Sequence, residues 1–344
     1  MSKIKKIEVF FLEYSFPKKL NYKYSAGVVE NMIVPVVKLT DINNNYGLGE
    51  VTHGQFTYEP IIGLTKHFSN LLKNTNSENI NEAWEKMYGS SVFWNREGLG
   101  IGVMGGINIA MYDLLGKRMK VPVYKLLGGI QKEKIRIYAS NGLFDNSKQL
   151  LEDAAKAYSL GFRVYKMRVI DPDSTINLVK SFNKKFKNKM QLIVDAVQGS
   201  AANPWGTKVS INLAKKLEKE EIIFLEEPFR VENLKGYKDI KKNTLLNIAG
   251  AESIPTGRAF KNARVPTAKM GQDLYVGNRT KYAGFAINAP GQTLPNLKNK
   301  QVTYAEHSKE HKITATSVNW YNVYTLGGLI NKDIDKAFKK VGFK

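Results

Sequence analysis

The sequence contains no cysteine among its 344 residues. This absence excludes disulfide bonds, thiolate nucleophiles and metal sites built on cysteine, and it fits a cytoplasmic protein, which is the location we predict. No apolar run approaches the roughly twenty residues that a membrane span needs. The basic start, Met1–Lys6, leads into an alternating segment and not into the apolar core of a secretion signal. We therefore expect no membrane partner.

Acidic residues are also scarce. The chain has 31 Asp and Glu against 52 Lys and Arg, which gives a formal net charge of +21. Such a charge raises the possibility of a nucleic-acid partner. However, the lysines are spread along the chain, and the densest run, Lys184–Lys189, is typical of the solvated end of a helix. No nucleic-acid-binding module is recognisable, so we expect no nucleic acid and instead a small anionic substrate.

Histidine is the third rare residue type, with four copies, and this leaves few groups that can exchange protons near neutral pH. His67 falls within a predicted helix. His311 is expected on the helix that follows the last predicted strand. The remaining candidates are His53 in a predicted loop and His307 at a predicted strand end.

The first part of the chain predicts strands followed by helices. Alternating apolar residues predict two strands that flank a polar and aromatic loop, and the Asn- and Gly-rich segment after the second strand predicts a hairpin turn. Helical spacing of apolar residues follows. The expected strands are 3–16, 29–41 and 47–51, around the loop 17–27 and the turn 41–47, and the expected helices are 59–72, 82–87 and 100–119.

From about residue 134 onward, strands and helices alternate about seven times. This rhythm is typical of a parallel sheet, and so many units favour a closed barrel. The clearest strand is Ile222–Pro228, an apolar run that ends in two glutamates and a proline. The proline cannot continue the ladder, and the two acids need a cation beside them if they are buried. The other expected strands are 134–140, 163–169, 190–196, 246–252, 268–273 and 301–307, with helices near 147–160, 173–186 and 209–219.

Charged residues stand at the ends of these strands, which is where parallel barrels carry their chemistry. A pair of cations comes first, then acids on three successive strands, then an acid and a histidine. For each acid alone, a helix cap or a salt bridge explains the residue as well as a functional role does. Each cation alone could instead form an ion pair with a neighbouring acid. The residues are Lys166, Arg168, Asp195, Glu226, Glu227, Glu252, Asp273 and His307.

The ordered set resembles the enolase superfamily, and within it the mandelate racemase and acid-sugar dehydratase group. The resemblance covers nearly the whole chain. Segments 106–117 and 122–129 are similar to the helix of the family's capping domain and to the entry of its barrel. The motifs at the strand ends are Lys166-Met167-Arg168, Asp195-Ala196, Leu225-Glu226-Glu227-Pro228 and Gly250-Ala251-Glu252.

The resemblance implies an α/β fold, a modified TIM barrel of (β/α)7β type with an N-terminal α+β capping domain. The capping domain would comprise 1–125 and the C-terminal segment 321–344, and the catalytic barrel would comprise 126–320. The resemblance also implies Mg²⁺ held by Asp195, Glu226 and Glu252, and carboxylates are the ligands that Mg²⁺ prefers. Glu227 is expected beside the site, because neighbouring strand residues point to opposite faces. We also expect a homo-oligomer.

The family reaction removes the α-proton of a carboxylate substrate and forms an enediolate stabilised by the metal. Lys166 and Arg168 would offset the excess negative charge and anchor the substrate. Arg168 stands where mandelate racemase has a lysine base. Its pKa, above about 12, makes it about 7 kcal/mol too costly a base near neutral pH. This favours a charge-stabilising role for Arg168 and disfavours racemisation by two bases.

The expected acid–base residue is His307, with Asp273 as its orienting partner. Their spacing departs from the family pattern. Gln272 is the alternative to Asp273, and Thr303 takes the histidine position in an ungapped count. The segment between Asp273 and His307 is expected to be a long loop, and His307 could also be a loop histidine without a role.

Loops of the capping domain, 19–27 and 50–58, would cover the mouth of the barrel. Their candidate substrate contacts are Tyr24, His53, Gln55 and Tyr58. A further loop, Gly199–Lys208, is expected on the same face. It follows Val197, where the family often has asparagine, and Gln198.

The sequence therefore predicts a Mg²⁺-dependent lyase that dehydrates a sugar acid or another hydroxy acid to a 2-keto acid. Three alternatives stay open. The first is a racemase or epimerase of a small hydroxy or amino acid, and the second is a cycloisomerase. The third is a metal-binding barrel that has lost catalysis and acts as a binding protein.

Overall fold

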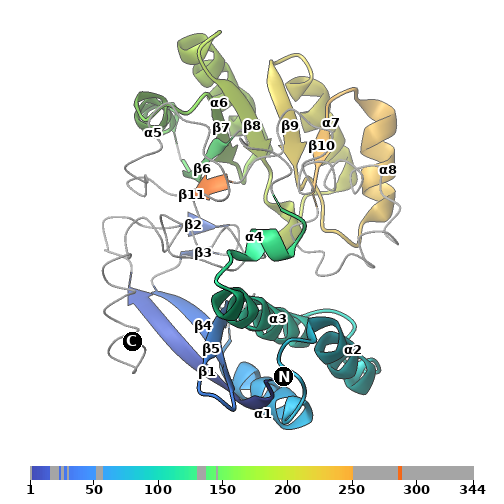
Figure 1. Ribbon diagram of the computed structural model, residues 1–344. Helices are drawn as coiled ribbons and strands as arrows, with labels where there is room; N and C mark the ends of the chain where they lie inside the picture. Colours follow the sequence, from blue (N-terminus) through green and yellow to red (C-terminus); the bar gives the residue numbers. More distant parts are fainter. Residues whose placement is uncertain are drawn as a thin grey trace.

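A computed structural model of the chain describes residues 2–15, 23–24, 27–28, 31–51, 57–129, 137–144, 146–250 and 286–288 (Figure 1). The described elements form two groups. An antiparallel sheet with helices packed on it occupies the lower part of Figure 1, and a parallel sheet with helices on its outside occupies the upper part. The strand-then-helix part and the alternating part of the sequence correspond to these two groups.

The antiparallel sheet has the strand order β1-β4-β5. Strand β1 covers Ile4–Ser15, β4 covers Asn31–Asp41 and β5 covers Tyr46–Glu50, as the alternating pattern predicted. The predicted loop 17–27 was partly wrong, because Lys23–Tyr24 (β2) and Gly27–Val28 (β3) pair as an antiparallel hairpin. The strand preference of Tyr and Val explains this pairing, and the Lys and Asn content of the segment concealed it.

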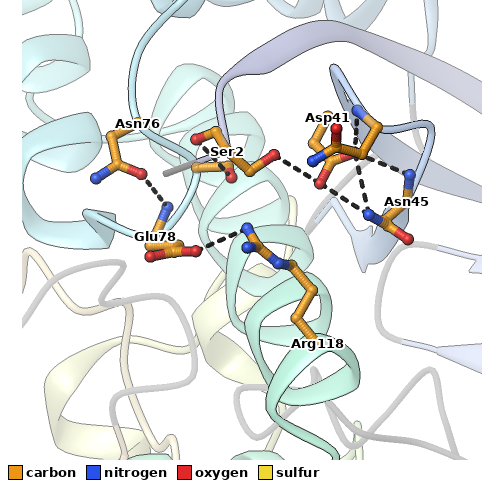
Figure 2. Close-up of polar contacts among 8 residues, drawn as sticks. Ser2, Asp41, Asn45, Asn76, Glu78 and Arg118 are labelled. Atoms are coloured by element: carbon orange, nitrogen blue, oxygen red, sulfur yellow. Dashed lines mark hydrogen bonds and ion pairs between the residues drawn. The ribbon is translucent and has the colours of Figure 1, made fainter.

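A buried carboxylate closes the turn between β4 and β5 (Figure 2). Asp41 accepts hydrogen bonds from the backbone N–H of Asn43 at 2.9 Å and of Asn45 at 2.8 Å, and from the hydroxyl of Ser2 at 2.7 Å. Burial raises the pKa of Asp41, but the hydrogen bonds from Ser2 and Asn45 and from the turn amides outweigh it and lower the pKa. Nearby, Arg118 pairs with Glu78 at 2.7 Å, which ties the end of helix α3 (Leu99–Met119) to the turn before helix α2 (Ile80–Ser91).

Three helices accompany this sheet. They are α1 (Glu59–Leu72), α2 (Ile80–Ser91) and α3 (Leu99–Met119), and a short helix, α4 (Val123–Leu126), follows them. Helices α1 and α3 pack on the sheet, and α2 packs on those two helices. Asn79 caps α2 by accepting from the backbone N–H of Glu82. By length and composition α3 could cross a membrane, but 67% of its apolar window is buried inside the protein, as in a core helix. The shared core includes Ile4, Val37, Leu39, Phe68, Met104, Ile107 and Met111.

The described part of the parallel sheet has the order β10-β9-β8-β7-β6-β11. Helices follow its strands in the predicted alternation and cover the outer face (Figure 1). The strands are β6 (Tyr138–Leu143), β7 (Val164–Arg168), β8 (Gln191–Asp195), β9 (Ile222–Glu226), β10 (Ile248–Ala249) and β11 (Ala286–Asn288). The helices are α5 (Ser147–Ser159), α6 (Pro172–Phe186), α7 (Thr207–Leu217) and α8 (Leu234–Asn243).

Strand β11 corrects a second prediction. It lies in the segment between Asp273 and His307 that was expected to be a loop, and it pairs in parallel with β6, with Ile287 opposite Ala139. The strands predicted at 268–273 and 301–307 lie outside the described residues.

Both faces of the parallel sheet are buried, which explains why its strands are continuous apolar runs and not alternating ones. The outer face packs on the helices through a large cluster that includes Leu178, Phe182 and Leu192. The inner face has a smaller cluster of Val164, Ile193, Phe224 and Ala249. Polar side chains that follow these inner residues by two positions face the same interior at the carboxyl end of the sheet.

Candidate active site

Three neighbouring strands end at the same level of the sheet. Arg168 at the end of β7 is opposite Asp195 at the end of β8, and Asp195 is opposite Glu226 at the end of β9. All three strands run in parallel, so their carboxyl ends meet at one edge. Lys166 precedes Arg168 by two positions and therefore faces the same side. The structure thus brings together four of the residues that the sequence placed at strand ends.

Lys166 is the centre of this group. Its ammonium donates to Asp195 Oδ2 at 2.9 Å and to Glu226 Oε2 at 2.8 Å, and only 6% of its side chain is exposed. Burial lowers the pKa of Lys166, but the negative charges of Asp195 and Glu226 outweigh burial and raise the pKa well above its usual value. The arrangement is a buried ion-pair triad in which one cation joins the ends of β7, β8 and β9.

The second oxygen of Asp195 has a different partner. The backbone N–H of Val197 donates to Asp195 Oδ1 at 2.9 Å. Val197 has φ of 45° and ψ of 27°, a left-handed conformation that a β-branched residue rarely adopts. This turn directly after β8 fixes the orientation of the Asp195 carboxylate.

Glu227 lies outside this triad. It is buried and has a left-handed backbone with φ of 42°, so the chain leaves the strand direction immediately after Glu226. A methyl group built on Gly199 would overlap the Glu227 carboxylate, so this carboxylate lies against the turn after β8. Strand alternation does not extend to Glu227, because β9 ends at Glu226.

The donor set fits a divalent cation with a preference for oxygen. The buried carboxylate of Asp195 and the partly buried carboxylate of Glu226 converge on one cation, here the ammonium of Lys166, and Mg²⁺ takes ligands of this kind. The third predicted ligand, Glu252, lies outside the described residues. Within the described part of the chain, no group of three or more acidic or histidine side chains comes together.

The remaining predicted residues divide in two. Asp273, His307, His53 and Gln55 lie outside the described residues. Tyr24 belongs to β2, which lies beside β6, so this segment of the capping region reaches the barrel sheet. Tyr58 is exposed at the start of α1, and its ring meets that of Phe11 edge-on with 5.7 Å between the centroids.

Ser140 is a residue that the sequence reasoning missed. It lies on β6 opposite Lys166 in register, and its side chain is buried. Its hydroxyl has no hydrogen-bond partner within the part of the chain that the structure describes. Ser140 stands at the end of the predicted strand 134–140, the same kind of position as the charged candidates. A serine carries no charge, so its position alone did not indicate a functional role.

Comparison with known families decides the assignment. The N-terminal domain model of mandelate racemase / muconate lactonizing enzyme matches residues 6–128, and the enolase C-terminal domain-like model matches residues 149–264. The chain belongs to the mandelate racemase / muconate lactonizing enzyme family. This confirms the resemblance that the strand-end motifs indicated. It also confirms the fold class, α/β with an N-terminal capping domain and the C-terminal domain of this family, of which the structure describes six strands of the parallel sheet.

Relatives in the mandelate racemase / muconate lactonizing enzyme family carry different activities. An arabinonate dehydratase from Saccharolobus solfataricus is 29% identical over 243 residues, which are 66% of this chain and 64% of that protein. The match thus spans a little under two thirds of the relative's own length.

Two solved structures share the fold at 25% identity. The 3,6-anhydro-D-galactonate cycloisomerase from Zobellia galactanivorans has a TM-score of 0.66, with 84% of this chain and 80% of that chain covered. A racemase from Streptomyces coelicolor with bound magnesium has a TM-score of 0.67, with 76% and 72% covered.

Proposed function

We propose that this protein is a Mg²⁺-dependent lyase that dehydrates a sugar acid or a related hydroxy acid to a 2-keto acid. The observation that carries the proposal is the convergence of Lys166, Asp195 and Glu226 at the ends of three successive barrel strands. The similarity to an arabinonate dehydratase supports a sugar acid as the substrate class.

The metal half of the proposed site comprises Asp195, Glu226 and Glu252. When bound, Mg²⁺ would stabilise the negative charge that develops on the substrate carboxylate as the α-proton leaves. The described carboxylates suit this task because they are largely buried and already share one cation. Lys166 and Arg168 would hold the substrate carboxylate and balance the charge of the acids.

Arg168 bears on the choice between dehydration and racemisation, because it stands where a second base would be needed. It is buried at the end of β7, beside Asp195 in register. A guanidinium stays protonated in proteins, so Arg168 can stabilise charge but cannot accept the α-proton. A reaction with one acid–base group is therefore favoured over racemisation, which needs a base on each face.

His307 is the proposed acid–base group, with Asp273 as its orienting partner. His307 would take the α-proton and then protonate the departing β-hydroxyl, so that water leaves and an enol forms, which tautomerises to the 2-keto acid. One histidine serves both steps if both groups leave from its side. Tyr24, His53, Gln55 and Tyr58 are the proposed contacts to the rest of the substrate.

Incubation with a panel of sugar acids tests this proposal. We expect one or more of them to yield a 2-keto acid that reacts with semicarbazide, and we expect EDTA to abolish the reaction and added Mg²⁺ to restore it. His307→Ala should remove activity, whereas His67→Ala on helix α1 should retain it. Full activity in His307→Ala, or activity that EDTA does not affect, would contradict the proposal.

A racemase, epimerase or cycloisomerase is the second candidate, because a racemase and a cycloisomerase share the fold at 25% identity. Exchange of the α-proton with solvent deuterium, without release of a 2-keto acid, would favour a racemase or epimerase. A binding protein without catalysis is the third, and it would bind a ligand from the panel without any turnover. The cytoplasmic location, the homo-oligomer and the domain boundary at residue 125 stay predictions.

A further inference from the structure

Several hydrogen bonds hold the turn after β8. Gln198 is buried, and its side chain forms one hydrogen bond with a residue before it and one with a residue after it in the sequence. Its Nε2 donates to the carbonyl oxygen of Ala196 at 2.7 Å, and its Oε1 accepts from the backbone N–H of Trp205 at 2.8 Å. One side chain thus closes the loop from residue 196 to residue 205.

The backbone of Gln198 makes a third connection. Its N–H donates to the carbonyl oxygen of Glu227 at 3.0 Å, which joins the turn after β8 to the turn after β9. Glu227 is in turn bonded through its N–H to the carbonyl oxygen of Ala249 on β10, also at 3.0 Å. The segments that follow β8 and β9 are therefore linked to each other and to strand β10 through residues 198 and 227.

Gln198 fixes the chain on both sides of Val197. Ala196, the residue before Val197, is held by the Gln198 amide, and residue 198 itself is held by Glu227. Val197 needs such support, because a left-handed conformation is unfavourable for an L-residue and least favourable for a β-branched one. Without support, Val197 would relax toward an ordinary conformation and move its N–H away from Asp195 Oδ1.

We propose that Gln198 is a positioning residue for the metal site. It keeps Val197 in the left-handed conformation, and through the Val197 N–H it holds the Asp195 carboxylate in the orientation that directs Oδ2 toward Lys166 and the proposed ion. This inference rests on the proposed function, because it assumes that Asp195 is a metal ligand. Residues that orient metal ligands in this way typically change metal affinity about 10- to 100-fold when they are replaced.

The test uses the full chain and Mn²⁺, which prefers the same oxygen ligands as Mg²⁺. Mn²⁺ affinity is measured by calorimetry, and thermal unfolding is recorded on the same samples without metal. Gln198→Met retains the length of the side chain but makes neither of its hydrogen bonds, and we expect it to bind Mn²⁺ at least about tenfold more weakly. Gln149→Met, at an exposed position on α5, is the matched control and should bind as the wild type does.

A second substitution separates positioning from a general loss of structure. Asn tolerates the left-handed conformation far better than Val. Val197→Asn combined with Gln198→Met should therefore recover most of the lost Mn²⁺ affinity, even if the unfolding temperature stays below that of the wild type. A merely structural role for Gln198 would lower the unfolding temperature and leave the affinity of the folded protein unchanged.

Each outcome bears on a different claim. Absence of Mn²⁺ binding by the wild type would overturn the proposed metal site, and this inference with it. Wild-type affinity in Gln198→Met would overturn the inference alone. Weakened binding that Val197→Asn does not recover would exclude the route through the left-handed turn.

Discussion

At the scale of the single residue, the charges of Lys166, Asp195 and Glu226 must compensate one another, because little solvent reaches them. Lys166, Asp195 and Glu226 are all withdrawn from solvent, and each would be costly without the others. The ammonium forms an ion pair with each of the two carboxylates. Removal of the ammonium should therefore affect stability and metal dependence together.

We predict that Lys166→Met destabilises the protein by about 3–5 kcal/mol in EDTA, because two largely buried carboxylates lose their common cation. Added Mg²⁺ should recover part of this loss, since it supplies a positive charge between the same oxygens. Urea unfolding with and without Mg²⁺ measures both effects. Lys180→Met on the exposed face of α6 is the control, and equal stability of Lys166→Met and wild type in EDTA would contradict the prediction.

Ser140 gives a second prediction at this scale. Its buried hydroxyl lies beside Lys166 and has no partner among the described residues, so a bound substrate can supply one. Ser140→Ala should raise KM about three- to tenfold, the worth of one neutral hydrogen bond, with little change in kcat and no loss of thermal stability. Ser159→Ala at the exposed end of α5 is the comparison, and an unchanged KM would remove the assigned contact.

The sequence predicted the charged residues of the site better than the neutral ones. Lys166 and the acids stand out because charges at the ends of apolar runs demand partners. Ser140 carries no such demand, and the role of Gln198 depends on the direction in which the chain turns after β8. Hydrogen bonds between a side chain and its own backbone neighbours leave no periodic pattern in a sequence.

At the scale of the secondary-structure element, apolar periodicity predicted most of the helices and the long strands, but it missed helix α8. It failed where strands are very short. Strands β2, β3 and β11 have two or three residues each, so no alternation can develop within them. Their existence depends on a neighbouring strand, β6 in the case of β11, which pattern reasoning on one segment does not see.

The contact between β5 and α3 depends on glycine. A methyl group on Gly47 would overlap the backbone oxygen of Ala110, and one on Gly49 would overlap that of Gly106, so helix and strand can approach only without these side chains. Backbone atoms cannot move aside as a flexible side chain can. The packing of the capping region on its longest helix is therefore intolerant of any side chain at these two positions.

We predict that Gly47→Ala destabilises the protein by about 3 kcal/mol or more, because α3 must shift from the sheet. Gly63→Ala is the control, since a methyl group there meets open space inside α1, and it should stabilise by roughly 0.5–1 kcal/mol through helix propensity. Denaturant unfolding of both variants tests the contrast. A Gly47→Ala protein as stable as the wild type would show that the two elements can separate without cost.

The turn between β4 and β5 gives a pH-dependent prediction. Because its hydrogen bonds lower the pKa of Asp41 below the unfolded value of about 3.9, Asp41 adds stability above that pH and loses it as the pH falls through the lower folded value. Asp41→Asn should cost about 1–3 kcal/mol at pH 7, since its amide group meets N–H donors.

The difference between Asp41→Asn and wild type should narrow as the pH falls below about 4. Urea unfolding over this range, with Asp239→Asn on α8 as the control for a lost charge, measures the effect. A difference that stays constant between pH 7 and pH 3 would show that ionisation of Asp41 does not support the turn.

At the scale of the whole molecule, fold and substrate class depend on different evidence. The alternation of elements and the matches of two domain models establish the architecture. Relatives with that architecture include a dehydratase, a cycloisomerase and a racemase, so the architecture alone does not select a reaction. In the proposed function, Arg168 and His307 make the selection, and at these positions the sequence departs from the family pattern.

The net charge of +21 acts at the same scale and gives the last prediction. A positive field attracts an anionic substrate over a distance that salt shortens, from about 30 Å at 0.01 M to about 8 Å at 0.15 M. We expect kcat/KM for the carboxylate substrate to fall several-fold between these ionic strengths, while kcat stays nearly constant because bound substrate no longer responds to the field. NaCl, KCl and sodium acetate at equal ionic strength should act alike if screening is the cause. If only one of these salts lowered kcat/KM, its anion or cation would be competing in the site, and if none did, the charge of the chain would have no part in substrate capture.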